Sequence, residues 1–245
     1  MVKKLLVIDL GLIDYLKAHD LQLKLVKLRS AGKIPDTLLL LEHEHVITLG
    51  KRLKSIDLRL PKIPVYKIER GGEATYHGPG QLVGYTIIDL EELGIDVWEY
   101  VRSIEEILMR TIKEFGLNGY RVKKYPGVWV NGRKIASIGL ALSHWITYHG
   151  FALNVNTDLR YFKLIKPCGL SPEMMTSIQR ELGRKADLEE VKQLVTKNFK
   201  EVLGFHELIE SSENMIQKIS DALGIKSSSS MDRYRLTDTR NISDF

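Results

Sequence analysis

Cysteine is almost absent from this sequence: Cys168 is the only one in 245 residues. A disulfide within the chain is therefore impossible, and a metal site built from several cysteine thiolates is excluded. Composition alone favours a small buried side chain for a lone cysteine. The other reading is a reactive thiol, and the residues around Cys168 have to decide between the two.

Long apolar runs are also absent. No stretch of about 18 or more apolar residues occurs, so we expect no membrane-spanning helix and no membrane partner. The opening sequence MVKKLLVIDLGLIDYL superficially resembles a signal peptide, but Asp9 interrupts its apolar run and no small-residue cleavage site follows. We therefore interpret residues 4–8 as a first β-strand and expect a cytoplasmic protein.

No run of like charge stands out, although the formal net charge is +5. Nucleic-acid binding is one explanation of a basic chain, but aromatic residues are not interleaved with the basic ones here. We therefore expect no nucleic-acid partner. Two explanations remain, a basic surface spread over many solvated side chains and attraction to an acidic protein partner.

Short strand patterns are combined with a few helical patterns along the chain. The strand patterns cover residues 38–41, 63–68 and 82–90, and the helical ones cover residues 12–29, 97–115 (ended by Gly116) and 188–203 (with Asp187 as N-cap). This arrangement predicts an α+β fold with a largely antiparallel mixed sheet flanked by helices, rather than a doubly wound parallel sheet. No internal repeat is seen.

The character of the chain changes after Gly204. Residues 206–224 have the pattern of one more amphipathic helix, four serines occupy residues 227–230, and the rest is polar. We expect one domain over residues 1–205, followed by a C-terminal helical appendage and flexible tail over residues 206–245.

The sequence RGGEATYHGPGQ, residues 70–81, holds four glycines and a proline in twelve residues. Such a stretch is not expected to form a regular element. Its glycines let the backbone approach a ligand closely, and hydrogen-bonding side chains lie between them. The alternative is an ordinary surface turn. The segment lacks the GK[ST] ending of a phosphate loop and the glycine spacing of a dinucleotide site.

A β-hairpin is predicted around Asn131-Gly132, a pair that suits a two-residue turn with positive φ. In that register Trp129 faces Lys134 across the two strands. A lysine on an apolar face loses solvation and its pKa falls, as a lysine base requires. The alternative is a solvated hairpin lysine. Residues 144–155, HWITYHGFALNV, are expected to form a further strand pair or one bulged strand. A structural role is favoured over a catalytic one for His144 and His149 on this strand.

Proline and glycine flank Cys168 in the sequence KPCGL, which places the thiol in a loop that a substrate can reach. A main-chain amide beside the thiol is a candidate for an oxyanion hole. A thiol reacts as its thiolate, so a nearby base or cation is needed. The candidates are Lys134, His77, His144 and His149.

The glycine segment at residues 70–81 resembles the signature loop of the lipoyl(octanoyl) transferases. The similarity continues through EHEHVITLGKR, GRKIASIG, HGFALNVN and PCG, in the order and spacing of that family, over residues 37–180. The resemblance implies the fold of the biotin and lipoate protein ligases. It also implies transfer of an octanoyl group from acyl carrier protein to a lysine of lipoyl domains, in dehydrogenase complex subunits and the glycine-cleavage H protein.

In that family the acyl group is held as a thioester on the cysteine that matches Cys168. The lysine that matches Lys134 lowers the pKa of this thiol, and no ATP, metal or other cofactor is needed. The acyl-binding positions implied by the resemblance are Arg70, Gly71, Gly72, Glu73, Ala74, Thr75, Tyr76, His77, Ser137, Ile138, Gly139, Gly150, Phe151 and Ala152.

Two other functions stay open on the sequence. An ATP-dependent lipoate or biotin ligase is the first, although the GRGR-type loop of biotin ligases is missing and lipoate ligases do not need a cysteine at Cys168. The second is a basic nucleic-acid-binding or scaffold protein of the same fold, although no helix-turn-helix segment precedes the domain. For His77 two roles remain, orienting the acyl carbonyl or holding the glycine segment.

Overall fold

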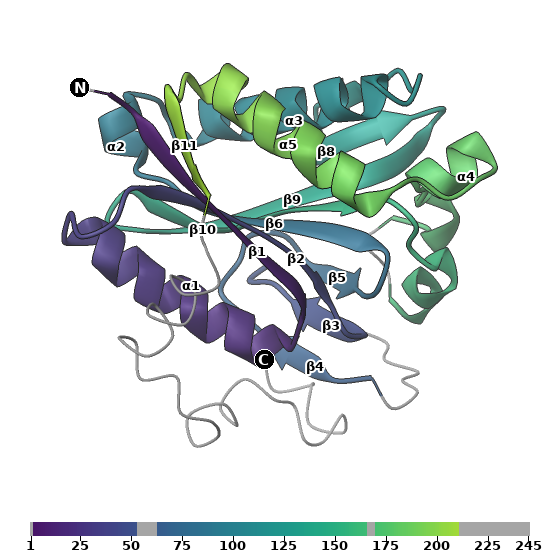
Figure 1. Ribbon diagram of the computed structural model, residues 1–245. Helices are drawn as coiled ribbons and strands as arrows, with labels where there is room; N and C mark the ends of the chain where they lie inside the picture. The colour runs from purple at the N-terminus through teal and green to yellow at the C-terminus, as the bar shows by residue number, and fades with distance from the viewer. Residues whose placement is uncertain (1, 53–62, 166–169, 211–245) are drawn as a thin grey trace.

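The computed structural model describes residues 2–52, 63–165 and 170–210. Within them, eight strands form one sheet in the order β11-β1-β2-β6-β10-β9-β8-β7 (Figure 1). The strands in that order are β11 (Glu207–Glu210), β1 (Lys4–Ile13), β2 (Asp36–His43), β6 (Gln81–Ile87), β10 (Ile146–Asn154), β9 (Arg133–Ser143), β8 (Tyr125–Val130) and β7 (Tyr120–Val122). β1 runs parallel to both of its neighbours, whereas the other pairs are antiparallel. The predicted mixed, largely antiparallel sheet is confirmed.

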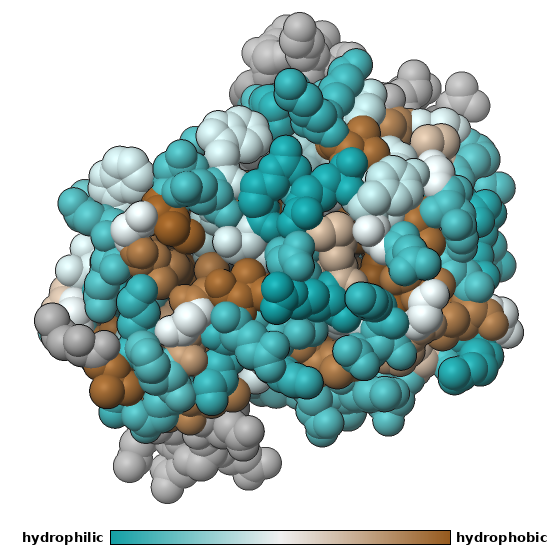
Figure 2. Space-filling model, turned by 90° about the horizontal axis from the view of Figure 1, so that it is seen from above, coloured by the Kyte–Doolittle hydropathy of each residue, from teal (hydrophilic) through white to brown (hydrophobic). Residues whose placement is uncertain are grey.

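Helices cover both faces of this sheet (Figure 1). The helices are α1 (Tyr15–Ser30), α2 (Leu90–Leu93), α3 (Val97–Lys113), α4 (Ile178–Leu182) and α5 (Leu188–Leu203), with short 3-10 turns at η1 (Leu159–Leu164) and η3 (Pro172–Met174). The four leucines of β2 explain the layering. Leu38 and Leu40 join the core under α3 and α5, while Leu39 and Leu41 join the core under α1. Polar side chains cover most of the surface seen from above (Figure 2).

Two predicted boundaries shift at the start of the chain. β1 continues to Ile13 through a register shift near Gly11, so it is longer than the predicted strand at residues 4–8. The helix then begins at Tyr15 rather than at residue 12, because the side chain of Asp14 accepts a hydrogen bond from the main-chain N–H of Lys17.

A second, smaller sheet has the strand order β4-β3-β5, with β4 (Val65–Lys67), β3 (Val46–Leu49) and β5 (Ala74–His77). The expectation that residues 70–81 contain no regular element is wrong at β5. These four residues are buried and pair antiparallel with β3. The glycines that suggested an irregular loop flank this short strand and do not interrupt it.

The predicted Asn131-Gly132 turn is confirmed. Both residues have positive φ, 49° and 77°, and Trp129 pairs with Lys134 as the two-residue turn requires. The next segment is one strand, β10, in which His149 has a positive φ of 58°. The expectation that His144 lies on a strand is wrong, because it sits in the turn between β9 and β10 with φ 51°.

The C-terminal segment begins differently from the prediction. Residues Glu207–Glu210 form β11, which pairs in parallel with β1 at the edge of the main sheet, so a helix starting at residue 206 is wrong for these four residues. Residues 211–245 lie outside the described part of the chain, and the division at residue 205 stays a prediction. In the described residues, no helix has the length and apolar character needed to cross a membrane.

Candidate active site

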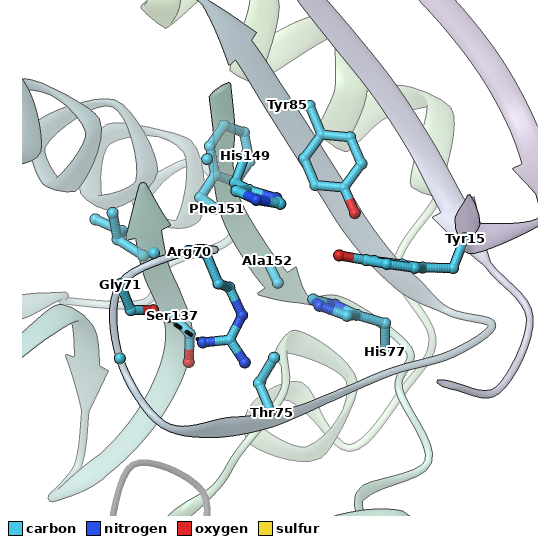
Figure 3. A pocket seen from close by; sticks show the side chains of 14 residues that line it. Tyr15, Arg70, Gly71, Thr75, His77, Tyr85, Ser137, His149, Phe151 and Ala152 are labelled. Carbon is cyan, nitrogen blue, oxygen red and sulfur yellow. Dashed lines mark hydrogen bonds between the residues drawn. The ribbon is translucent and has the colours of Figure 1, made fainter. Parts of the chain in front are cut away.

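A pocket opens between the glycine segment, the N-terminal end of α1 and strands β6, β9 and β10 (Figure 3). About 490 Å³ of space lies between its walls, including the open mouth. It is lined by Tyr15, Arg70, Gly71, Gly72, Thr75, His77, Tyr85, Ser137, Ile138, Gly139, His149, Gly150, Phe151 and Ala152.

This lining brings together most of the acyl-binding positions that the resemblance implied. Their role in binding stays a prediction, but their convergence is a fact of the fold. Glu73, Ala74 and Tyr76 are not among the lining residues. The sequence did not predict that Tyr15 and Tyr85 line the pocket. Each lies in a segment whose pattern indicates burial but gives no sign of a ligand site.

Two of the segments that line the pocket are neighbours because strands β9 and β10 pair in the main sheet. Ser137–Gly139 of β9 lies directly opposite Gly150–Ala152 of β10, with Gly139 paired to Gly150. On the other side of β10, a Cβ added to Gly150 would lie 2.1 Å from the main-chain oxygen of Gly84 in β6. Only glycine therefore fits at position 150, and its lack of a side chain lets β6 and β10 approach closely at the pocket wall.

Arg70 holds the glycine segment in place. Its guanidinium donates a hydrogen bond to the carbonyl oxygen of Gly71 at 2.9 Å (Figure 3). It also donates to the carbonyl oxygen of Thr48 at 2.7 Å. The N–H of Gly71 donates to the carbonyl of Leu140 in β9 at 2.8 Å. The segment is thus fastened to both sheets, which presents its backbone to the pocket as a fixed surface.

Polar groups from distant segments point into one side of the pocket (Figure 3). Tyr85 is held there by His43: one ring nitrogen of His43 faces the Ile13 carbonyl at 2.9 Å, and the other faces the Tyr85 hydroxyl at 2.7 Å. Because a carbonyl only accepts, His43 donates at Nδ1 and accepts the Tyr85 hydrogen at Nε2. Burial lowers the pKa of His43 to about 4, so this acceptor is neutral at neutral pH.

His19 and Glu69 form a mostly buried pair behind His149, with 2.9 Å between Nε2 and the carboxylate oxygen. Burial raises the pKa of Glu69, but the hydrogen bond and charge of His19 outweigh it and bring that pKa to about 2. The ligand atoms of His19, Glu69 and His149 lie within 4.8 Å of one another, so among the described residues these three side chains are close enough together to hold a divalent cation. Glu69 already has a partner in the absence of a cation, because it is hydrogen-bonded to His19.

Lys134 is almost entirely buried, with 3% of its surface exposed. The reading as a solvated hairpin lysine is therefore wrong. Gly127 makes room for it on β8, since a Cβ at Gly127 would lie 2.9 Å from the Lys134 Cε. The side chain of Glu105 in α3 accepts a hydrogen bond from the Gly127 N–H at 3.0 Å and fixes that strand.

The main chain of Lys134 is joined to the segment that follows the predicted nucleophile. Its carbonyl accepts a hydrogen bond from the Thr176 N–H at 3.0 Å, and it forms a bridge with Met175. Cys168 itself, in the sequence KPCG at residues 166–169, lies outside the described residues. The contact between Cys168 and Lys134 therefore stays a prediction. Of the other candidate bases, His77 and His149 line the pocket, whereas His144 is exposed in its turn.

The fold is the one seen in lipoate–protein ligases. A crystal structure of lipoate-protein ligase A bound with ATP superposes with a TM-score of 0.70 over 95% of this chain and 98% of that one, at 19% identity. The model of the family "Lipoyl protein ligase A/B catalytic domain" matches residues 14–200. The chain belongs to this family.

Within the family, its similarity extends to proteins named octanoyltransferase. The relative from Syntrophobacter fumaroxidans is 47% identical, in an alignment that covers 78% of this chain and 87% of that protein. The relative from Koribacter versatilis is 49% identical, covering 79% of this chain and 82% of that protein.

Proposed function

We propose that this protein is an acyltransferase that moves an octanoyl group from acyl carrier protein to a lysine of lipoyl domains. The observation that carries this proposal is the identity of nearly half to two octanoyltransferases along most of the chain. The ATP-bound ligase shares the fold at 19% identity, which does not extend to its reaction. The acceptors would be the lipoyl domains of dehydrogenase complex subunits and the glycine-cleavage H protein.

The pocket suits the acyl chain. Ile138, Phe151 and Ala152 supply apolar surface among the lining residues. A concave, partly apolar site with a few converging polar groups is the usual form of a small-ligand pocket. The acyl chain would lie along this surface.

In the first step the Cys168 thiolate attacks the carbonyl carbon of the donor thioester. A new C–S bond forms, the bond to the carrier sulfur breaks, and the carrier thiolate takes a proton from the Lys134 ammonium. In the second step the neutral amine of the acceptor lysine attacks the acyl-enzyme, the bond to Cys168 breaks, and the amine proton goes to Lys134. The thiolate–ammonium pair is thereby restored.

Both the energetics and the local structure support this sequence of steps. Exchange of one thioester for another is nearly thermoneutral, so no ATP is needed, and the protein supplies ionisation, positioning and charge stabilisation. Lys134 is buried opposite Trp129, and its main chain pairs with Met175, a short distance along the chain from Cys168. The net charge of +5 would raise the encounter rate with acidic carrier and lipoyl domains in the cytoplasm.

The donor requirement separates this function from an ATP-dependent ligase. We expect octanoyl-acyl carrier protein to octanoylate a lipoyl domain without ATP, because the thioester is already activated. Free octanoate should give no product, with or without ATP. The measurement is the intact mass of the lipoyl domain in each of these mixtures. Product that appears only from octanoate plus ATP would contradict the proposal and favour a ligase.

A further inference from the structure

A chain of buried hydrogen bonds runs from the pocket to the segment beside Lys134. The Nδ1 atom of His77 lies 2.7 Å from Gln81 Oε1, and Gln81 Nε2 donates to Asn154 Oδ1 at 2.9 Å. The Asn154 amide donates in turn to the Thr176 carbonyl at 2.9 Å. All these residues are buried. Because the Thr176 N–H also bonds to the Lys134 carbonyl, the chain links the pocket with the candidate base.

The donor and the acceptor of each hydrogen bond in this series follow from the Thr176 carbonyl at one end. The Thr176 carbonyl can only accept, so Asn154 presents its NH2 group to it and its oxygen to Gln81. The NH2 group of Gln81 also donates to the Tyr76 carbonyl at 3.2 Å, which fixes the same amide orientation independently. The Gln81 oxygen is therefore left for His77, and Nδ1 of His77 must be the donor.

The ring of His77 consequently carries its lone pair on Nε2. Figure 3 shows the ring at the edge of the pocket, beside Tyr15. Burial, and then the nearby His43, lower the pKa of His77 to about 3, so the ring is neutral at neutral pH. Among the described residues, the bond to Gln81 is the one hydrogen bond seen for this ring. His77 Nε2 therefore presents a hydrogen-bond acceptor to the pocket.

An acceptor cannot stabilise an acyl carbonyl or an oxyanion, because both require donors. It suits an N–H group, such as that of an attacking amine. We propose that Gln81 and Asn154 are positioning residues that hold His77 in the pocket as the hydrogen-bond acceptor for the amine of the incoming lysine. This inference rests on the proposed function. It also decides between the two roles considered for His77, against orienting the acyl carbonyl.

The amine in the second step has two N–H bonds. One hydrogen leaves to Lys134 as the N–C bond forms and the C–S bond to Cys168 breaks. The other hydrogen stays on the product amide and is the one that His77 Nε2 accepts, which aims the nitrogen lone pair at the carbonyl. His77 keeps no proton. The first step involves no amine, so the hydrogen bond to His77 contributes to the second step alone.

Single-turnover measurements on Gln81→Met test this asymmetry. The substitution keeps the side-chain length but removes the acceptor for His77 Nδ1, so the ring can adopt the other tautomer. We expect transfer from the acyl-enzyme to a lipoyl domain to slow by about 10- to 100-fold. This is the rate effect expected when one buried hydrogen bond in the transition state is lost. Formation of the acyl-enzyme, followed by intact mass, should change by less than about threefold.

Asn198→Met is the matched control. Asn198 is a buried amide on α5 that donates to Thr111 of α3 at 3.1 Å, and neither residue lines the pocket. Its loss should leave both steps near the wild-type rates. Equal slowing of both steps in Gln81→Met, or no slowing of transfer, would overturn the inference. A wild-type protein that forms no acyl-enzyme would instead overturn the proposed function.

The tautomer of His77 has its own readout. In nitrogen-15 NMR spectra of the wild-type protein we expect a protonated Nδ1 and an unprotonated Nε2, and a protonated Nε2 would overturn the inference even if the Gln81 variants do not fold. In Gln81→Glu the new carboxylate should raise the pKa of His77. Protonation turns Nε2 into a donor, so transfer by this variant should increase as pH rises through that pKa.

Discussion

Replacing Lys134 by arginine is expected to lower octanoyl transfer by about 100- to 10,000-fold, the usual effect of losing a general acid–base group. Arginine keeps the positive charge but does not release its proton, and Lys134 is buried beside Gly127. Lys134→Met, which removes the charge as well, should lose at least as much. The measurement is the rate of octanoylation of a lipoyl domain.

Lys124→Arg provides the control for this substitution. Lys124 is an exposed residue at the start of the same hairpin, and its ammonium lies 5.5 Å from the centre of the Tyr125 ring, a contact that arginine can also make. Its activity should match wild type. Near-normal transfer by Lys134→Arg would show that Lys134 acts through its charge alone and not by moving a proton.

Gly150→Ala is expected to lower both the stability of the fold and octanoyl transfer. The added methyl group would lie 2.1 Å from the Gly84 carbonyl oxygen, so β6 and β10 have to separate at the pocket wall. We expect a loss of about 3 kcal/mol in the free energy of unfolding, as for a severely overpacked core position, and loss of octanoyl transfer. Urea unfolding and the transfer assay measure the two effects.

Gly71→Ala separates this steric effect from a general intolerance of alanine near the pocket. Its added methyl group would lie 3.4 Å from the Leu140 carbonyl oxygen, an ordinary contact, and its φ is not in the left-handed region. Its free energy of unfolding should equal that of wild type or exceed it by up to about 1 kcal/mol. If Gly150→Ala is as stable as Gly71→Ala, the close approach of β6 and β10 is not required.

Local sequence determines the features that could be predicted. The Asn131-Gly132 pair fixes a turn, and the turn fixes the pairing of Trp129 with Lys134, so this register could be predicted from six adjacent residues. The leucines of β2 likewise indicate a strand covered on both faces. These signals depend on neighbours in the chain and need no knowledge of tertiary packing.

The features that escaped prediction depend on contacts between distant segments. β5 is a strand because it pairs with β3, and β11 is a strand because it pairs with β1 at the opposite end of the chain. Tyr15 and Tyr85 reach the pocket only when α1 packs across β6. The chain of amides through Gln81 and Asn154 joins three separate segments, and neither residue carries a local signal of that role.

The central claim is that Cys168 carries the acyl group. Intact mass after incubation with octanoyl-acyl carrier protein, with no acceptor present, tests it most directly. The account predicts a gain of one octanoyl group that hydroxylamine removes, and no such gain in Cys168→Ala. A Cys168→Ala protein that still octanoylates a lipoyl domain at the wild-type rate would contradict the account.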